Sequence, residues 1–147
     1  MNNKTPQVYQ GRCQCGDVSY EVEGKPEVVA HCYCQECQRG SGGGHTTGAM
    51  FRVDSFHLTG QVSKYEYISD NGNKVSRFFC PRCGSPIFGQ NSGMGAYLTI
   101  TLGTLKKSSD FKPEVAIFTR NRKKWDIVDK TILMFEAQPN WKPDDDT

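Results

Sequence analysis

The chain has 147 residues, a formal net charge of +2 and 36% hydrophobic residues. This length predicts one domain, over residues 1–147, that is large enough to bury a core. No apolar stretch approaches the length needed to cross a membrane, so no membrane partner is expected. Residues 1–7 lack the apolar core of a secretory signal, and we therefore expect a reducing, cytoplasmic location.

Short β-prone stretches separated by turn signals recur along the chain and predict a mainly β fold. Apolar and polar residues alternate over 17–23, which is typical of a half-buried strand, and the apolar run 28–30 leads into a cysteine cluster. Residues 40–44 are mostly glycine and predict an irregular loop. Further strands are expected over 49–53, 63–68, 74–79, 87–89, 96–103 and 115–118, with a turn or short helical turn over 54–60 and a hairpin turn at 69–73.

No long amphipathic helix and no internal repeat is evident, so the fold is expected to be all-β or mainly β. The basic run 120–125 contains one tryptophan, and we interpret it as a solvated face or as a contact for an anionic small molecule. Residues 140–147 are polar and acidic, and they are expected to form a flexible tail.

All seven cysteines fall in three short clusters. Thiolates so close in sequence can bind one metal ion, and a glycine after a cysteine pair lets backbone amides point at sulfur. A closed structural zinc site takes four protein ligands, whereas a catalytic site takes three and leaves one position open. We therefore predict two zinc ions per chain, one bound by Cys13, Cys15, Cys80 and Cys83 and one by Cys32, Cys34 and Cys37.

Other arrangements of the same clusters remain open at this point. The middle cluster could share ligands with the last one, or His31 or His45 could complete the second site and make both zinc ions structural. Disulfides are a poorer interpretation, because Cys-x-Cys pairs bridge poorly and seven is an odd number. Seven thiolates and two zinc ions would take the net charge to about −1, which argues against a nucleic-acid partner.

Several motifs follow one another in a specific order. They are Gly11-x-Cys13-x-Cys15-Gly16-x-Val18-x-Tyr20, Cys32-x-Cys34-x-x-Cys37, Arg77-Phe78-Phe79-Cys80-x-x-Cys83-Gly84-Ser85-Pro86-Ile87, Gly103-x-Leu105, and Trp125 ahead of Phe135-Glu136. With them the chain resembles the glutathione-dependent formaldehyde-activating enzyme family, which includes the centromere protein V-like proteins, over about residues 9–139. It departs from the family's frequent residues at Tyr33, where histidine is common, and at Gln38, where arginine is common.

The resemblance implies a zinc-binding β-tent fold like that of the Mss-type proteins. It also implies that the paired clusters are structural and that the triplet Cys32, Cys34 and Cys37 is the active site. The implied activity is that of a zinc-dependent, carbon–sulfur lyase-like enzyme acting on adducts of a glutathione-like thiol and a formaldehyde-like aldehyde. Arg39 is the cation nearest the triplet in sequence, and we predict that it binds the carboxylates of the thiol. Arg77, Arg82 and the run 120–124 could reach the site only if the fold brings them there.

Two other functions fit the same residues. One is a binding module with two structural zinc sites and no catalysis, which would require a fourth protein ligand at the triplet. The other is a redox or metal sensor, which would require the triplet to lose zinc readily.

Overall fold

The computed structural model describes residues 7–139, and these residues form a mainly β domain, as predicted. None of its helices is long and apolar enough to span a membrane. The predicted tail, 140–147, lies outside the described residues. The elements are β1 (Val8–Arg12), β2 (Ser19–Glu23), β3 (Val28–Cys32), α1 (Gln35–Ser41), β4 (Thr46–Arg52), β5 (Phe56–Thr59), β6 (Ser63–Ile68), β7 (Lys74–Phe79), β8 (Pro86–Asn91), β9 (Tyr97–Thr101), β10 (Val115–Ile117) and β11 (Leu133–Met134), with single 3₁₀ turns at Val53–Ser55, Ser92–Met94, Leu102–Thr104, Ser108–Asp110 and Thr119–Asn121.

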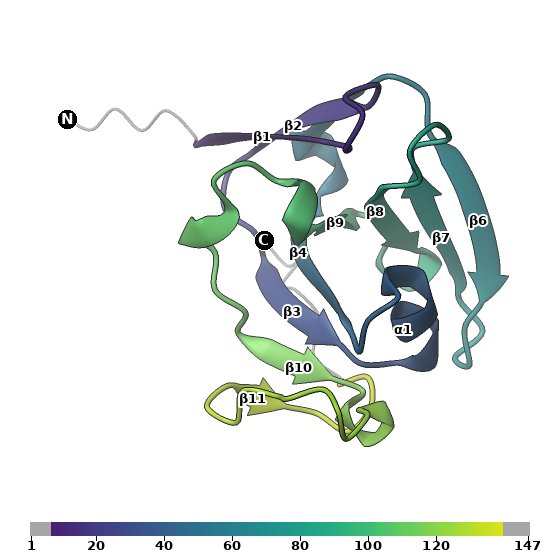
Figure 1. Ribbon diagram of the computed structural model, residues 1–147, viewed down its shortest axis with the longest axis vertical. Helices are drawn as coiled ribbons and strands as arrows, with labels where there is room; N and C mark the ends of the chain where they lie inside the picture. Colours follow the sequence, from purple (N-terminus) through teal and green to yellow (C-terminus); the bar gives the residue numbers. More distant parts are fainter. Residues whose placement is uncertain (1–6, 140–147) are drawn as a thin grey trace.

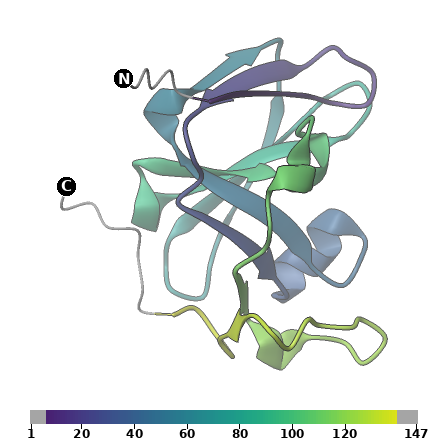
Figure 2. The same ribbon diagram turned by 90° about the vertical axis from the view of Figure 1, so that its left-hand side faces the viewer.

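The strands form two sheets. The small sheet has the order β1-β2-β5, and the large sheet has the order β11-β10-β3-β4-β9-β8-β7-β6. All pairs are antiparallel except those that β10 makes with β3 and β11, which are parallel. The small sheet lies at one end of the molecule and β10 and β11 lie at the other, and α1 forms part of the connection from β3 to β4 (Figures 1 and 2).

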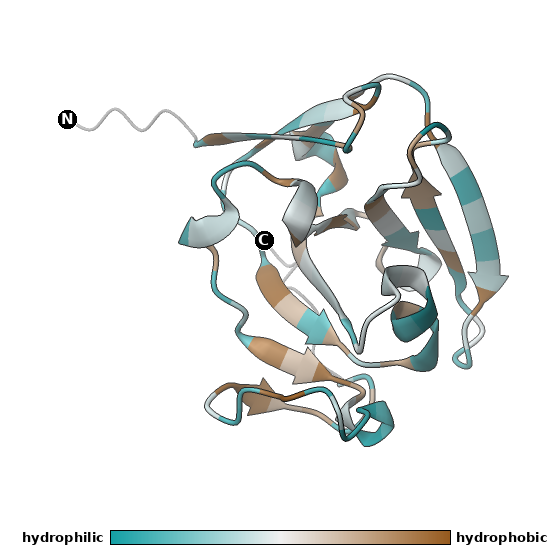
Figure 3. Ribbon diagram, viewed as in Figure 1, coloured by the Kyte–Doolittle hydropathy of each residue, from teal (hydrophilic) through white to brown (hydrophobic). Residues whose placement is uncertain are grey.

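The core lies between the two sheets and includes two of the cysteines. Hydrophobic residues gather on β3 and β10, whereas α1 and most of the edge strand β6 are hydrophilic (Figure 3). Burial of the apolar side chains supplies the main favourable term for folding. The buried cluster consists of Cys13, Val18, Tyr20, Val22, Val29, Ala49, Phe51, Cys80, Ile87, Phe88, Leu98, Ile100 and Leu105.

The segment after the cysteine triplet is more regular than expected. Residues 40 and 41 belong to α1, and the irregular loop begins only at Gly42. Cys34 caps the N-terminus of α1, because its Sγ accepts a hydrogen bond from the Cys37 N–H at 3.3 Å. Gly42 ends the helix with a left-handed φ of 75°. The structure also differs at β5, where a turn was expected, and at β1 and β11, for which no strand was predicted.

Gly11 on β1 lies directly under the ring of Tyr20, whose hydroxyl forms a 2.7 Å hydrogen bond with the Thr104 hydroxyl. A Cβ at position 11 would overlap the Tyr20 ring and lie 2.7 Å from the Thr104 carbonyl oxygen. We therefore expect Gly11→Ala to lower the free energy of unfolding by about 1–3 kcal/mol, measured by urea denaturation. The control is Gly103→Ala, whose Cβ would meet nothing within 4 Å. Equal stability of the two variants would contradict this close packing.

Candidate metal centres

The first and last cysteine clusters meet at the junction of the two sheets. Cys13 and Cys15 follow β1, and Cys80 and Cys83 follow β7, yet all four sulfur atoms lie within 4.8 Å of one another. The Sγ atoms of Cys13 and Cys15 are 3.7 Å apart, as are those of Cys15 and Cys80. A tetrahedron of sulfur atoms at metal–sulfur bonds of about 2.3 Å has an edge of about 3.8 Å, so this cluster fits a four-coordinate metal ion.

Backbone amides point at the sulfur atoms of this cluster. The N–H of Val18 donates to Cys13 Sγ at 3.3 Å, and the N–H of Cys83 donates to Cys80 Sγ at 3.4 Å. Gly16 and Gly84 follow the cysteine pairs with φ values of 88° and 79°, a conformation that side chains with a Cβ rarely adopt. The predicted knuckle turns are therefore present at both pairs.

The amides and hydroxyls around this cluster favour thiolates. Hydrogen bonds from the side chain and backbone of Ser85 lower the pKa of Cys83 to about 5. Cys13 and Cys80 are buried, and a buried thiolate needs hydrogen bonds or a cation to be stable. The four residues predicted for the closed site can thus hold a metal ion together.

The triplet forms a second, separate cluster. Cys32 ends β3, Cys34 caps α1 and Cys37 lies in its first turn, and their sulfur atoms all lie within 4.8 Å of one another. The pKa of Cys37 is lowered, chiefly because the thiols of Cys32 and Cys34 donate hydrogen bonds to it, whereas hydrogen bonds of Cys32 with Cys34 and then with Cys37 raise the pKa of Cys32. The donor set of three thiols fits a metal ion with a free coordination position. The alternative in which the middle cysteine cluster shares metal ligands with Cys80 and Cys83 is therefore wrong.

One cation reaches the triplet from the large sheet. Arg77 on β7 directs its Nη2 at Cys37 Sγ, 3.5 Å away, and at the Tyr67 hydroxyl, 3.2 Å away. Burial alone would lower the pKa of Arg77, but the neighbouring Cys37 sulfur raises it. Nothing in the sequence around Arg77 indicates this contact, because it joins residues 40 positions apart.

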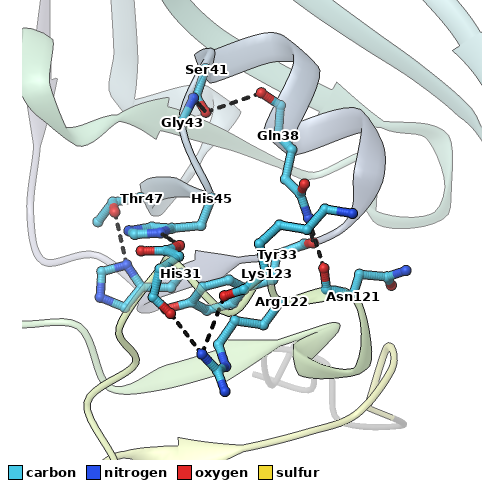
Figure 4. Close-up of polar contacts among 11 residues, drawn as sticks. His31, Tyr33, Gln38, Ser41, Gly43, His45, Thr47, Asn121, Arg122 and Lys123 are labelled. Atoms are coloured by element: carbon cyan, nitrogen blue, oxygen red, sulfur yellow. Dashed lines mark hydrogen bonds and ion pairs between the residues drawn. The ribbon is translucent and has the colours of Figure 1, made fainter.

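The two histidines near the triplet face the other side of β3. His31 and Tyr33 alternate with Cys32 and Cys34 along the chain, so their side chains lie on the opposite side from the sulfur atoms, where both rings lie beside that of His45 (Figure 4). His31 Nδ1 lies 2.8 Å from the Thr47 hydroxyl, and burial followed by the proximity of His45 lowers the pKa of His31. Among residues 7–139, neither histidine joins the triplet sulfurs. The alternative in which a histidine completes this site is therefore wrong.

His45 and Tyr33 belong to this second face. His45 Nδ1 lies 2.6 Å from Asp126 Oδ2, and its ring lies 4.8 Å from that of Tyr33, which is buried. These contacts attach Asp126, just after the basic run 120–125, to the segment before β4 and to the residue that follows β3.

Gln38 holds the same segment against α1. Its side-chain Nε2 donates to the carbonyl oxygens of Tyr33 and Asn121 at 2.8 and 2.9 Å (Figure 4). Arg122, within the basic run, donates to the Asp126 carbonyl oxygen at 2.7 Å. The run is therefore partly a structural contact rather than only a solvated face, although Trp125 is 69% exposed.

Arg39, the predicted substrate contact, is exposed on α1. It lies two residues after Cys37 and therefore about 200° around the helix from it. None of the ion pairs within residues 7–139 involves Arg39. Its proposed role stays a prediction.

Comparison with known proteins assigns these clusters to a family. Residues 8–121, which contain all seven cysteines, match the glutathione-dependent formaldehyde-activating enzyme family. The chain belongs to this family. No match was found among curated proteins. Among solved structures, the chain is similar to a crystal structure of a Rhodobacter sphaeroides protein, with a TM-score of 0.55 and 19% identity, covering 67% of this chain and 88% of that one. At this identity the likeness shows the shared fold alone.

If the four-cysteine cluster holds a metal ion, metal binding contributes to the folding free energy of this family member. We expect Cys80→Ser to yield unfolded or insoluble protein, because it removes a buried sulfur that links segments 65 residues apart. Circular dichroism and metal quantification by mass spectrometry would test this. A soluble, folded variant that keeps both metal ions would contradict the assignment.

Proposed function

We propose that this protein is a zinc-dependent, carbon–sulfur lyase-like enzyme that acts on adducts of a small, glutathione-like thiol and a formaldehyde-like aldehyde. The supporting observation is the donor set of the triplet: three cysteine sulfurs, joined by no histidine, carboxylate or further cysteine of residues 7–139. Three protein ligands are typical of catalytic zinc sites and four of structural ones. Cys32, Cys34 and Cys37 would accordingly hold a catalytic zinc ion, and Cys13, Cys15, Cys80 and Cys83 a structural one.

Zinc at the triplet, when bound, supplies a position at which a thiol loses its proton near neutral pH, although a free thiol has a pKa of about 8.5. In the adduct-forming direction, the thiol sulfur bonds to the aldehyde carbon, and the S–H proton ends on the carbonyl oxygen. No oxidant or reductant is consumed. Three thiolates leave a zinc site with a charge of −1, which weakens its Lewis acidity, so thiol activation is favoured over polarisation of the aldehyde.

The proposed thiol carries carboxylates, and we propose that Arg39 binds one of them. Arg39 is exposed on α1, two residues after Cys37, and the contact would require its long side chain to reach around the helix. All seven cysteines are free of disulfides, which agrees with the reducing conditions of a cytoplasmic enzyme.

A binding module with two structural zinc ions has less support. It requires a fourth protein ligand at the triplet, and the two candidate histidines, His31 and His45, form contacts with Thr47 and Asp126 instead. The two functions differ in whether the fourth ligand exchanges with added thiol.

Cys34→Ser tests the role of the triplet with little risk to the fold. Serine is a preferred N-cap residue, so α1 should keep its cap while the site loses a thiolate. We expect a folded protein that binds one metal ion fewer per chain and no longer accelerates adduct formation. The measurements are zinc quantification and an NMR assay of glutathione with formaldehyde, against the rate without protein. Unfolding as complete as that of Cys80→Ser would indicate two structural sites instead.

Arg39→Ala tests the proposed carboxylate contact. Loss of a charge-assisted hydrogen bond costs roughly 1.5–3 kcal/mol, which corresponds to a KM for glutathione about ten- to a hundredfold higher. The KM for 2-mercaptoethanol, which lacks a carboxylate, should not change. Lys25→Ala removes an exposed charge between β2 and β3 and serves as the control. A KM for glutathione within twofold of the wild type would exclude Arg39 as the anchor.

A further inference from the structure

Arg77 is the only arginine or lysine in residues 7–139 whose side chain donates a hydrogen bond to a sulfur of the triplet. It reaches Cys37 from β7, across the gap between the large sheet and α1. A single nitrogen, Nη2, serves both Cys37 Sγ and the Tyr67 hydroxyl, and it has one hydrogen for each acceptor. The Tyr67 ring also lies beside the guanidinium, with its centre 5.6 Å from Cζ.

The chain leaves room for this guanidinium on α1. Gly40 lies one turn after Cys37, and a Cβ at this position would lie 2.7 Å from Arg77 Nη1 and 3.3 Å from Cζ. Glycine inside a helix costs stability relative to alanine, by up to about 1 kcal/mol. The guanidinium is thus confined between Tyr67 on the sheet and a helix position without a side chain.

The position of Arg77 matters because of the charge of the site. A divalent cation with three thiolates carries a charge of −1, and an incoming thiolate would raise it to −2. The guanidinium offsets one of these charges, and its hydrogen bond withdraws electron density from the Cys37 sulfur. Both effects strengthen the binding of a further anionic ligand, in the manner of other groups that surround metal ligands.

We propose that Arg77 is a positioning and charge-compensating residue that holds the Cys37 sulfur and sets the affinity of the triplet site for an anionic thiol ligand. This inference rests on the proposed function, in which a substrate thiol binds at the triplet. It adds to that function a specificity residue on β7, 40 positions after the sulfur that it contacts.

Two substitutions perturb the guanidinium from opposite sides. Arg77→Met removes the charge, whereas Gly40→Ala keeps the arginine and displaces it, because its flexible end must move away from the new Cβ. Gly43→Ala is the matched control, since the nearest atom to its Cβ would be Ser41 Oγ at 3.7 Å. Arg77→Lys keeps the charge but loses the planar, forked donor.

The measurements are metal content, glutathione affinity by calorimetry and the absorption spectrum of the cobalt(II)-substituted protein. We expect all variants to keep two metal ions. Arg77→Met and Gly40→Ala should bind glutathione about ten- to a hundredfold more weakly, and Arg77→Lys should recover part of the loss. In Arg77→Met and Gly40→Ala, the sulfur-to-cobalt charge-transfer band should move to longer wavelength, because a sulfur without its hydrogen bond gives up electrons more easily. Gly43→Ala should match the wild type in glutathione affinity and in the wavelength of this band.

Two results would overturn the inference. One is an Arg77→Met protein with wild-type glutathione affinity and an unshifted cobalt band. The other is loss of metal and fold in Arg77→Met with no change in Gly40→Ala, which would make Arg77 a structural link between β7 and α1. If the wild type binds cobalt at the triplet but no thiol, the proposed function fails instead. The band shift then still decides whether Arg77 controls the Cys37 sulfur.

Discussion

At the junction of the two sheets, four sulfur atoms lie close enough to share a cation. Cys13 and Cys15 lie between β1 and β2, Cys80 and Cys83 follow β7, and at sulfur–sulfur distances of 3.7 Å thiolates would repel one another strongly without a positive charge between them. The sheets also meet through the apolar core, where the ring of Phe56 on β5 packs against that of Phe88 on β8 with centroids 4.9 Å apart. The cluster thus joins β7 directly to the β1–β2 connection of the small sheet, and β7 in turn carries Arg77 to the triplet.

The alternation of side chains along β3 separates two kinds of chemistry. Cys32 and Cys34 direct their sulfur atoms toward that of Cys37, whereas His31 and Tyr33 lie beside His45, which contacts Asp126 after β10 (Figure 4). Tyr33 is only 1% exposed, and its ring packs against His45 rather than against the sulfur atoms. The residue between the two cysteines can therefore differ from the family's frequent histidine without altering the metal ligands.

Ligand counting predicted which cysteines gather, because seven thiols divide into one four-coordinate set and one open set. Periodicity predicted most strands, including the hairpin of β6 and β7. It missed α1, since this helix has only seven residues, of which the last two belong to the glycine-rich stretch 40–44, and its N-cap is a cysteine of the triplet. It also could not find Arg77. Whether a strand residue contacts a helix depends on the order of the strands in the sheet and on their register. Neither can be read from the sequence around that residue.

Gln38 changes where the positive charge near the triplet comes from. Its position is only 7% exposed, and an arginine there, as is frequent in the family, would need an anion such as a metal-bound thiolate nearby. Glutamine can be buried at this position without a charge, because its Nε2 donates hydrogen bonds to the carbonyl oxygens of Tyr33 and Asn121. The helix of this chain therefore contributes sulfur but no buried cation. Within residues 7–139, the charge that balances the thiolates at contact distance comes from β7, so the electrostatics of the site follow the placement of the sheet.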